Sequence, residues 1–397
     1  MDNNNTSINN DQTRSLLFFI AMTFSTLFMF RGLTLWGPYS ELESYFEYFA
    51  WFFTTVLLVT SFQAYSPLAK LIIVCAIPLS LYIGLNCDRL SFTYFSLALI
   101  VGAKDVELKK IIKVHFGISL SFCLFNVIGN YLGFIKDATN LDQSDRLSIF
   151  FDSVFRKSFG YDWSTDFASH VFLILLSLWV IKKGLLSYKL MALYLAIMLF
   201  VLFETGTRMA SAVIFLIVLF SLYCKFRNPQ IISKIVKYLT VFSVPFFACV
   251  SLYLTMKFND KEITWLVIDA IMSGRLQLGQ DAILEKGIPL FGQVYKMYGG
   301  GNSLGGNEYN YIDNSYIQFL VILGIVATLA FIFCYVRLCL RAYKQNDVVL
   351  LLAVFASALF GVITQFHFNY AFCPLVLGAF AALNGDDVFD DSVEDAS

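Results

Sequence analysis

The stretch from Ser315 to Cys339 reads SYIQFLVILGIVATLAFIFCYVRLC and has no charged residue before Arg337. An α-helix needs about 20 predominantly apolar residues to cross the hydrocarbon core of a bilayer. This stretch is long enough, so it is predicted to be a transmembrane helix. It decides the fold because stretches of the same kind recur along the whole chain.

The composition excludes a water-soluble globule. Of the 397 residues, 58% are hydrophobic and 14% are charged, whereas about 25% of the residues in soluble domains are charged. The net charge of −1 provides no basic surface for nucleic acid. The 42 Phe residues are interpreted as lipid-facing and packing residues. The predicted fold class is an all-α polytopic membrane protein, with residues 1–397 forming a single integral membrane domain.

Apolar runs separated by polar or charged breaks predict about twelve transmembrane helices. Their predicted bounds are Leu16 to Met29, Tyr45 to Phe62, Leu68 to Leu85, Leu90 to Ala103, Ile111 to Gly133, Phe167 to Ile181, Leu186 to Phe203, Met209 to Cys224, Ile231 to Met256, Ser315 to Cys339, Val348 to Gln365 and Tyr370 to Leu383.

Basic residues predict the orientation of these spans, because Lys and Arg favour the cytoplasmic side of short loops. With the N-terminus inside, the even-numbered connections should be basic, and they are. The C-terminus, with the acidic tail 384–397, is then also cytoplasmic. Met1 to Thr13 has no basic signal-peptide region, so the first span is predicted to be retained. The basic residues are Lys70; Lys104, Lys109, Lys110 and Lys113; Lys182, Lys183 and Lys189; Lys225, Arg227, Lys234 and Lys237; and Arg337, Arg341 and Lys344.

Two predicted outer loops, 134–166 and 257–312, are long enough to have a functional role. The first contains apolar residues at helical spacing among charged ones, a pattern typical of a helix on the membrane surface. The second has a helical pattern from Lys261 to Lys286, then Pro289 and the glycine-rich stretch from Gly299 to Gly306, interpreted as a flexible lid. The apolar residues of the surface helix are Leu147, Phe150, Phe151, Val154 and Phe155.

No metal or cofactor is predicted. The three His residues have no ligand spacing, and the Cys residues lack a C-x-x-C pair and are interpreted as small buried hydrophobic residues. These residues are His115, His170 and His367, with Cys75, Cys87, Cys123, Cys224, Cys249, Cys334, Cys339 and Cys373.

Three charged residues at the outer ends of the spans are candidates for chemistry. Arg208 lies where the seventh predicted span returns into the eighth; it either meets an anion or is an interfacial Arg that pairs with Glu204. Arg275, on the outer helical pattern, could hold phosphate through two parallel hydrogen bonds or simply be solvated. Asp313, at the start of the tenth span, could have a tuned pKa or could cap the helix.

The order and spacing of these short motifs resemble those of the Wzy-like polysaccharide polymerases, which are grouped with the O-antigen ligases. The resemblance covers the twelve-span hydropathy pattern, a T-G-T-R element, S-G-R and F-G in the long outer loop, and D-N-S-Y-x-x-x-L-x-x-x-G after it. The matching residues are Gly206 and Arg208; Ser273, Gly274 and Arg275; Phe291 and Gly292; and Asp313, Asn314, Ser315, Tyr316, Leu320 and Gly324.

The resemblance implies a GT-C-like glycosyltransferase of the bacterial plasma (inner) membrane, acting in O-antigen, capsule or exopolysaccharide synthesis. Such an enzyme moves a glycan from undecaprenyl diphosphate onto a sugar hydroxyl of another lipid-linked repeat unit at the outer face. The ligase branch carries His where this chain has Asp313, which favours a polymerase. The implied partners are the undecaprenyl-diphosphate-linked oligosaccharide, membrane lipids and a chain-length regulator.

The expected chemistry assigns a role to each candidate. Arg208 and Arg275 would stabilise the departing diphosphate, and Asp313 would accept the proton of the attacking hydroxyl. Attack opposite the leaving diphosphate would invert the anomeric centre. The transfer is expected to need no metal, since no D-x-D motif occurs in the outer loops. Several Tyr residues could stack on sugar rings or could belong to an aromatic belt at the membrane surface. His367 could bind acceptor hydroxyls or could be an interfacial residue whose hydrogen bonds are satisfied. The predicted substrate-binding residues are Asn314, Tyr316, Gln365, His367 and Asn369, and the stacking candidates are Tyr295, Tyr298, Tyr309, Tyr311 and Tyr316.

Two other functions remain open at the level of sequence. An O-antigen ligase would differ only in its acceptor. A lipid-linked oligosaccharide flippase or other transporter would place charged residues near the membrane midplane, whereas here they gather at the span ends.

Overall fold

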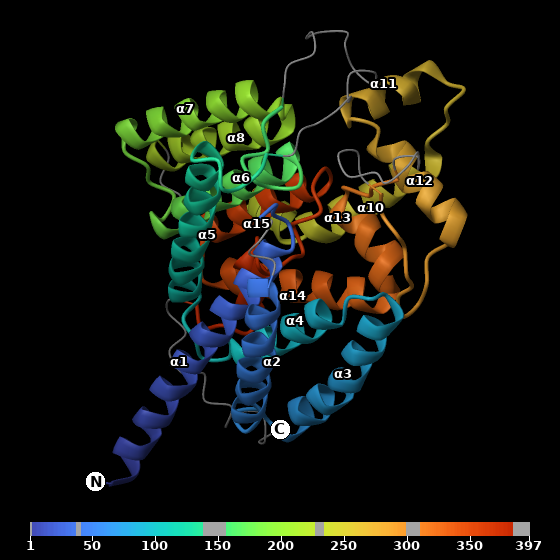
Figure 1. The fold of residues 1–397 in the computed structure, drawn as a ribbon. Helices are drawn as coiled ribbons and strands as arrows, with labels where there is room; N and C mark the ends of the chain where they lie inside the picture. The colour runs from blue at the N-terminus through green and yellow to red at the C-terminus, as the bar shows by residue number, and fades with distance from the viewer. Residues whose placement is uncertain (1, 37–40, 138–155, 227–233, 299–309, 384–397) are drawn as a thin grey trace.

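The computed structural model describes residues 2–36, 41–137, 156–226, 234–298 and 310–383 (Figure 1). Within these ranges the chain is helical, with two isolated β-bridges and no named strand. The predicted surface helix around 147–155, the glycine-rich stretch and the acidic tail lie outside the described residues.

Eight helices of the described chain are long and apolar enough to cross a membrane, as expected for a polytopic α-helical membrane protein. The first candidate span, Gln12–Arg31, is part of α1 (Asp2–Arg31). The other seven are α2 (Glu41–Phe62), α3 (Pro67–Asn86), α5 (Leu108–Tyr131), α6 (Ser164–Ile181), α7 (Tyr188–Thr205), α8 (Arg208–Phe226) and the combined stretch Ser315–Lys344.

Three further predicted spans form shorter apolar helices, which are α4 (Leu90–Gly102), α10 (Ser243–Lys257) and α15 (Val348–Gly361). The predicted ninth span, Ile231 to Met256, is interrupted at Phe242, between α9 (Lys234–Val241) and α10. Pro245 explains the interruption, because proline cannot donate a backbone hydrogen bond and its ring clashes with the carbonyl four residues earlier.

The predicted twelfth span, Tyr370 to Leu383, is wrong as an α-helix. This segment consists of turns and the 3₁₀-helix η4 (Pro374–Ala379), and its side chains are almost completely buried. Irregular backbone at membrane depth is tolerated only where it lies inside protein or lines a cavity. The carbonyl of Ala379 accepts hydrogen bonds from Arg337 and Arg341, which satisfy one carbonyl that has no α-helical partner.

The predicted outer helix from Lys261 to Lys286 is two helices, α11 (Ile263–Ile271) and α12 (Arg275–Lys286). Between them, Ser273 and Gly274 have φ angles of 61° and 78°, which end the right-handed helix. The carboxylate of Asp269 accepts a hydrogen bond of 2.8 Å from the backbone N–H of Leu276 in the first turn of α12. This turn fixes where Arg275 lies.

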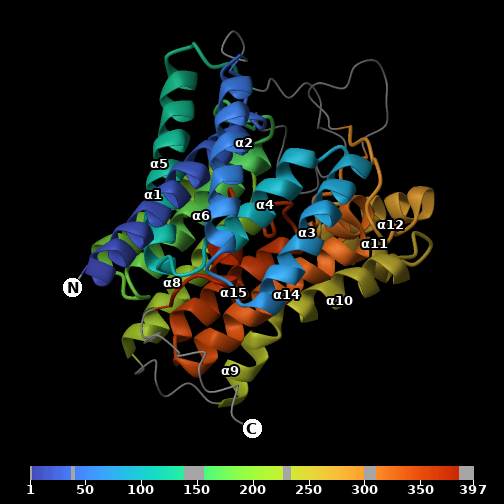
Figure 2. The same ribbon diagram turned by 90° about the horizontal axis from the view of Figure 1, so that it is seen from below.

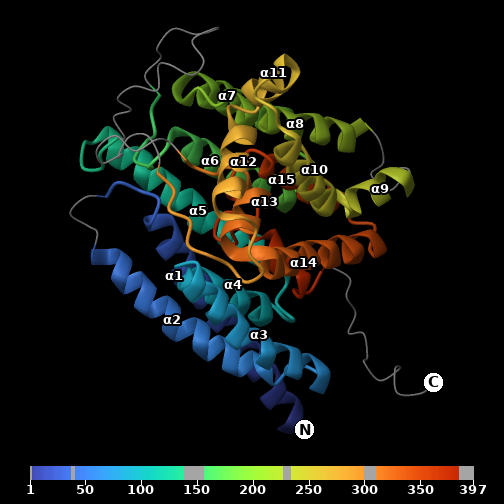
Figure 3. The ribbon, with the colours of Figure 1, turned by 90° about the vertical axis from the view of Figure 1, so that its right-hand side faces the viewer.

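The helices form a bundle in which α1 to α3 lie on one side and α7 and α8 on the opposite side (Figures 1 and 3). Helices α10, α14 (Gly324–Lys344) and α15 pack against one another (Figure 2) and lie between these two groups (Figure 3). In the candidate span of α6, 72% of the residues are buried, against 17% in that of α3, so α6 belongs to the core and α3 to the periphery. Helices α11 and α12 lie far from the described N-terminal end of α1 (Figure 1).

Candidate functional site

An ion pair joins the S-G-R and D-N-S-Y motifs. The Nη2 atom of Arg275 lies 3.2 Å from Oδ2 of Asp313, and the two side chains are 11% and 17% exposed. A second guanidinium nitrogen of Arg275 donates a 2.9 Å hydrogen bond to the carbonyl of Met272. Its Nε atom is buried and has no hydrogen-bond partner among the described residues. Two contacts therefore fix the guanidinium, and its Nε–H can still donate a hydrogen bond to a ligand.

The helix after Asp313 is capped by its neighbour. The side chain of Asn314 accepts hydrogen bonds of 3.0 and 3.2 Å from the backbone N–H groups of Tyr316 and Ile317, at the start of α13 (Ser315–Gln318). The alternative in which Asp313 caps this helix is thus wrong, because its carboxylate contacts Arg275 instead. The Tyr316 hydroxyl donates to the carbonyl of Ala358 at 2.8 Å. These contacts of Asn314 and Tyr316 are structural, and their contact with substrate stays a prediction.

Burial raises the pKa of Asp313 above its usual value, and the Arg275 guanidinium opposes that shift. A carboxyl group with a raised pKa is a stronger base when ionised. Asp313 therefore combines the two properties that proton transfer requires, since it has a fixed position and a raised affinity for the proton.

The F-G motif meets the last glycine of the D-N-S-Y motif. Gly324 follows the π-helix η3 (Phe319–Leu323), and both Gly324 and Gly292 have a φ angle of 85°. A Cβ atom on Gly324 would lie 2.6 Å from the backbone nitrogen of Gly292, so only glycine fits. The N–H of Gln293 donates to the carbonyl of Ile322 at 2.9 Å. This contact fastens the chain after α12 to the helix that follows Asp313.

A network of polar side chains adjoins Asp313. The Oε1 atom of Gln365 accepts hydrogen bonds from the Tyr311 hydroxyl at 2.8 Å and from Gln318 Nε2 at 3.1 Å. The amide nitrogen of Gln365 donates to Asp166 at 3.4 Å. Burial raises the pKa of the Tyr311 phenol, and the carboxylates of Asp166 and Asp313 raise it further. Sequence reasoning missed Asp166, although an acidic residue at the start of an apolar run was a usable signal.

Arg208, the first residue of α8, lies beside another arginine. Burial and the charge of Arg208 both lower the pKa of Arg156. A Cβ atom on Gly206 would lie 3.0 Å from Nε of Arg156, and Glu204 forms a 2.8 Å ion pair with Lys157. The T-G-T-R turn therefore places Arg208 close enough to Arg156 for their charges to interact. Of the three predicted catalytic residues, the structure brings Arg275 and Asp313 into contact and places Arg208 next to Arg156.

The other predicted residues are placed as follows. His367 is 1% exposed, and neither ring nitrogen has a hydrogen-bond partner among the described residues. Its ring stacks on Tyr335 at 4.6 Å, so the alternative of a satisfied interfacial residue is wrong. Of the predicted sugar-stacking tyrosines, Tyr295 is buried and Tyr298 is exposed, while Tyr309 lies outside the described residues.

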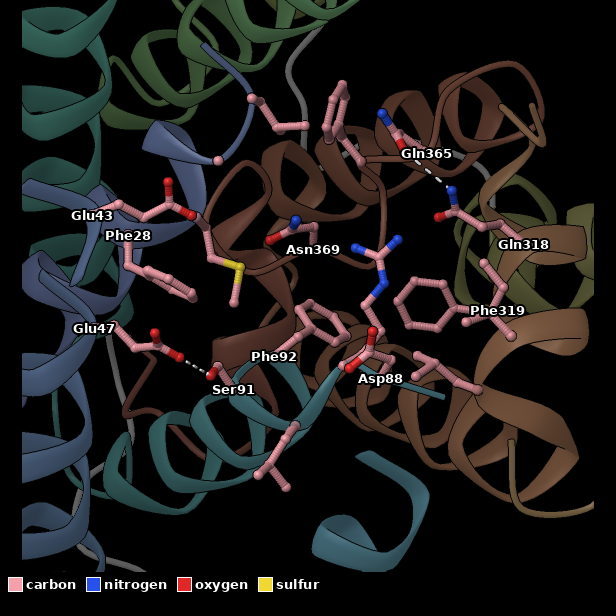
Figure 4. A pocket seen from close by; sticks show the side chains of 18 of the residues that line it. Phe28, Glu43, Glu47, Asp88, Ser91, Phe92, Gln318, Phe319, Gln365 and Asn369 are labelled. Atoms are coloured by element: carbon pink, nitrogen blue, oxygen red, sulfur yellow. Dashed lines mark hydrogen bonds between the residues drawn. The ribbon is translucent and has the colours of Figure 1, made fainter. Parts of the chain in front are cut away.

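A cavity of about 720 Å³ opens beside this network (Figure 4). Gln318, Gln365 and Asn369 line it on one side, and Glu43 and Glu47 of α2 line it on the other. Asp88 and Arg89 contribute from the connection between α3 and α4, and Ser91 contributes from the first turn of α4. The aromatic lining residues are Phe28, Trp51, Phe92, Phe319 and Phe366.

Within the described residues, no group of three or more His, Cys, Asp or Glu residues is arranged to hold a metal ion. Comparison with known protein families, with curated proteins and with solved structures gives no match for this chain.

Proposed function

We propose that this protein is a membrane-embedded polysaccharide polymerase. It transfers a glycan from undecaprenyl diphosphate to a sugar hydroxyl of another lipid-linked repeat unit, at the outer face of the plasma membrane. The observation that supports the proposal is the ion pair between Arg275 and Asp313. It joins two segments whose motifs resemble those of the Wzy-like polymerases, and it pairs a cation for phosphate with a carboxylate for proton transfer.

In the proposed reaction, the acceptor hydroxyl attacks the anomeric carbon while Asp313 takes up the hydroxyl proton. The bond between the anomeric carbon and the phosphate oxygen breaks, and the diphosphate leaves with the electron pair. Attack opposite the leaving group inverts the anomeric centre. Arg275 stabilises the growing negative charge, and the pair of Arg208 and Arg156 supplies further positive charge.

The ion pair also suggests how the carboxylate becomes available. Without substrate, Arg275 is the counterion of Asp313. A bound diphosphate gives the guanidinium a stronger anionic partner, because bidentate contacts with phosphate oxygens are among the strongest hydrogen bonds of arginine. Asp313 is then free to accept the proton of the sugar hydroxyl.

The test is to express Arg275→Ala, Asp313→Asn and Arg208→Ala in the native host and to measure polysaccharide chain length on gels. Loss of a general base or a charge-stabilising group is expected to slow transfer about 100-fold or more, so single repeat units should accumulate when polymer is normalised to the amount of protein in the membrane. Glu285→Gln is the control, because its ion pair with Lys286 on the same helix is exposed. Normal chain lengths in all three variants would refute the proposal. Retention of lipid-linked units on the inner face would indicate transport instead.

A further inference from the structure

The residues that line the 720 Å³ cavity reach the segment just before the proposed catalytic carboxylate, although Asp313 is not itself one of them. Gln318 lines the cavity, and its Nε2 atom donates a 3.1 Å hydrogen bond to the carbonyl of Ile312, the residue before Asp313. The same amide nitrogen donates to Gln365, which also lines the cavity. A molecule in the cavity would therefore contact Gln318, which is hydrogen-bonded to the segment just before Asp313. The volume is within the range of about 300–1,000 Å³ that is typical of small-molecule sites.

The lining combines side chains that can bind a saccharide. Carboxylates and amides form hydrogen bonds with sugar hydroxyls, and the faces of aromatic rings are apolar surfaces against which a sugar ring can pack. Trp51 lines the cavity and is held by stacking on Tyr94, with ring centroids 4.6 Å apart. Asn369 projects into the same space in Figure 4.

The charges of the lining are unequal. Among the described residues that line the cavity, the carboxylates of Glu43, Glu47 and Asp88 are opposed by one cation, Arg89. One carboxylate is already hydrogen-bonded, because the Ser91 hydroxyl donates to Glu47 at 2.5 Å. An acidic guest would meet like charge at close range, whereas a neutral or amine-bearing guest would not.

We infer that this cavity is the acceptor-saccharide site, and that it selects sugars bearing hydroxyl, acetamido or amino groups over sugars bearing a carboxylate. The role of the bound saccharide as the acceptor rests on the proposed function. The selection itself depends only on the cavity. The competing occupant is a lipid acyl chain, which the aromatic walls could also accommodate.

The experiment measures binding of three β1,4-linked disaccharides to the purified full chain in nanodiscs. They are N,N′-diacetylchitobiose, its deacetylated diamine and cellobiouronic acid, and the readouts are saturation-transfer NMR and quenching of Trp51 fluorescence. The diamine and the diacetyl form should bind at least about tenfold more tightly than the uronic acid, because the cavity is acidic. Trp51→Phe should remove the fluorescence response.

Two sets of variants assign the binding to the cavity. Glu47→Gln with Asp88→Asn should strengthen binding of the uronic acid and weaken binding of the diamine, and Asn369→Leu should weaken binding of all three sugars. Asp260→Asn with Glu285→Gln removes the same charge from exposed carboxylates outside the cavity and should change nothing. Thermal midpoints like that of the wild type show that each variant is folded.

Equal or tighter binding of the uronic acid would overturn the inference. A phospholipid in the cavity would also overturn it. This outcome would appear as a bound phospholipid in mass spectra, together with saturation-transfer signals of the sugars that Trp51→Phe and Asn369→Leu leave unchanged. Asp313→Asn separates this inference from the proposed function, because it should abolish polymer formation and leave disaccharide binding intact. Polymerisation that survives in this variant, with the selective binding retained, would contradict the proposed function alone.

Discussion

At the scale of single residues, the account depends on one carboxylate and one guanidinium, Asp313 and Arg275, which lie 3.2 Å apart and are largely shielded from solvent. A buried ion pair adds little net stability, because desolvation offsets the attraction of the charges. Removing one partner is strongly destabilising, because it leaves an uncompensated charge. The two side chains are therefore coupled, and this coupling can be measured separately from catalysis.

Arg275→Ala should lower stability by about 3 kcal/mol, and adding Asp313→Asn should restore part of that loss because the stranded charge is removed. Without Arg275, burial alone acts on Asp313 and raises its pKa further. The single variant should then lose stability as the pH rises, since its folded form holds the proton more tightly. Thermal unfolding in detergent at several pH values measures both effects. A double variant less stable than Arg275→Ala would contradict the coupling.

Asp162 gives a second prediction from a single residue. Burial raises its pKa to about 6 and Glu43 also raises it, while Arg31 acts in the opposite direction. Because the folded pKa lies above the unfolded value of 3.8, the stabilisation by the bound proton is complete below about pH 4 and is lost as the pH rises to about 6. Asp162→Asn should therefore gain about 3 kcal/mol relative to the wild type between those pH values. A difference in thermal midpoint that is independent of pH would refute this assignment.

At the scale of elements, the site is built from interruptions in helices. The turn at Ser273 and Gly274 separates α11 from α12 and places Arg275 at the start of α12. The π-helix η3 ends at Gly324, whose close approach to Gly292 fastens the outer segment to α14. Short π-helical segments are frequent at functional sites. The sequence periodicity predicted continuous helices here, because a left-handed turn does not change the apolar pattern.

Gly324→Ala should destabilise the protein more than Gly287→Ala does. Both glycines have positive φ angles, 85° and 72°, with ψ angles of 175° and −170°, a region that only glycine adopts readily, so each substitution introduces backbone strain of about 1–3 kcal/mol. A Cβ atom on Gly324 would additionally meet three backbone atoms within 2.8 Å, whereas Gly287 has open space around it. The expected difference is about 2 kcal/mol or more, measured by thermal unfolding and by proteolysis of the segment after α12. Equal effects would indicate that the two segments are not tightly fastened.

At the scale of the whole molecule, the bundle surrounds an irregular buried segment. The last described residues, from Tyr370 to Leu383, lie in the core, and the N–H of Leu108 and the carbonyl of Val106 pair with the backbone of Ala382. This contact places the end of the segment at the connection between α4 and α5. The opposite end of the segment lies near the polar network of Gln365. The molecule thus has two ends, one bearing the candidate site and one bearing the basic connection after α4.

The proposed orientation can be tested by labelling cysteines in intact cells. Cys75 and Cys249 are the exposed native thiols, so both are first replaced by Ser. Glu285→Cys, on α12, should react with a membrane-impermeant maleimide, and Lys182→Cys, after α6, should react only after the cells are opened. The reverse pattern would place the candidate site on the cytoplasmic side and contradict the proposed function.

The sequence predicted the elements whose structure depends on the length of an apolar run. It did not predict the elements whose structure depends on contacts between side chains. The stretch from Ser315 to Cys339 lies within the candidate span Ser315–Lys344, and eleven predicted spans contain apolar helices. Tyr370 to Leu383 failed because apolar content does not distinguish a helix from a buried irregular segment held by Arg337 and Arg341. Arg275 and Asp313, two of the three predicted catalytic residues, are in contact, whereas the approach of Arg208 to them stays a prediction. Glu43, Glu47 and Arg89 were missed because only the fold brings them to one cavity.

In the proposed function, Arg275 and Asp313 carry out glycan transfer from a lipid diphosphate. The most direct measurement supplies the purified protein in liposomes with defined lipid-linked repeat units and a metal chelator, and it records the product ladder and the anomeric configuration of the new bond. The wild type should give a ladder with inverted linkages, Asp313→Asn should give unextended units, and Glu285→Gln should match the wild type. A full ladder from Asp313→Asn and Arg275→Ala would contradict the account.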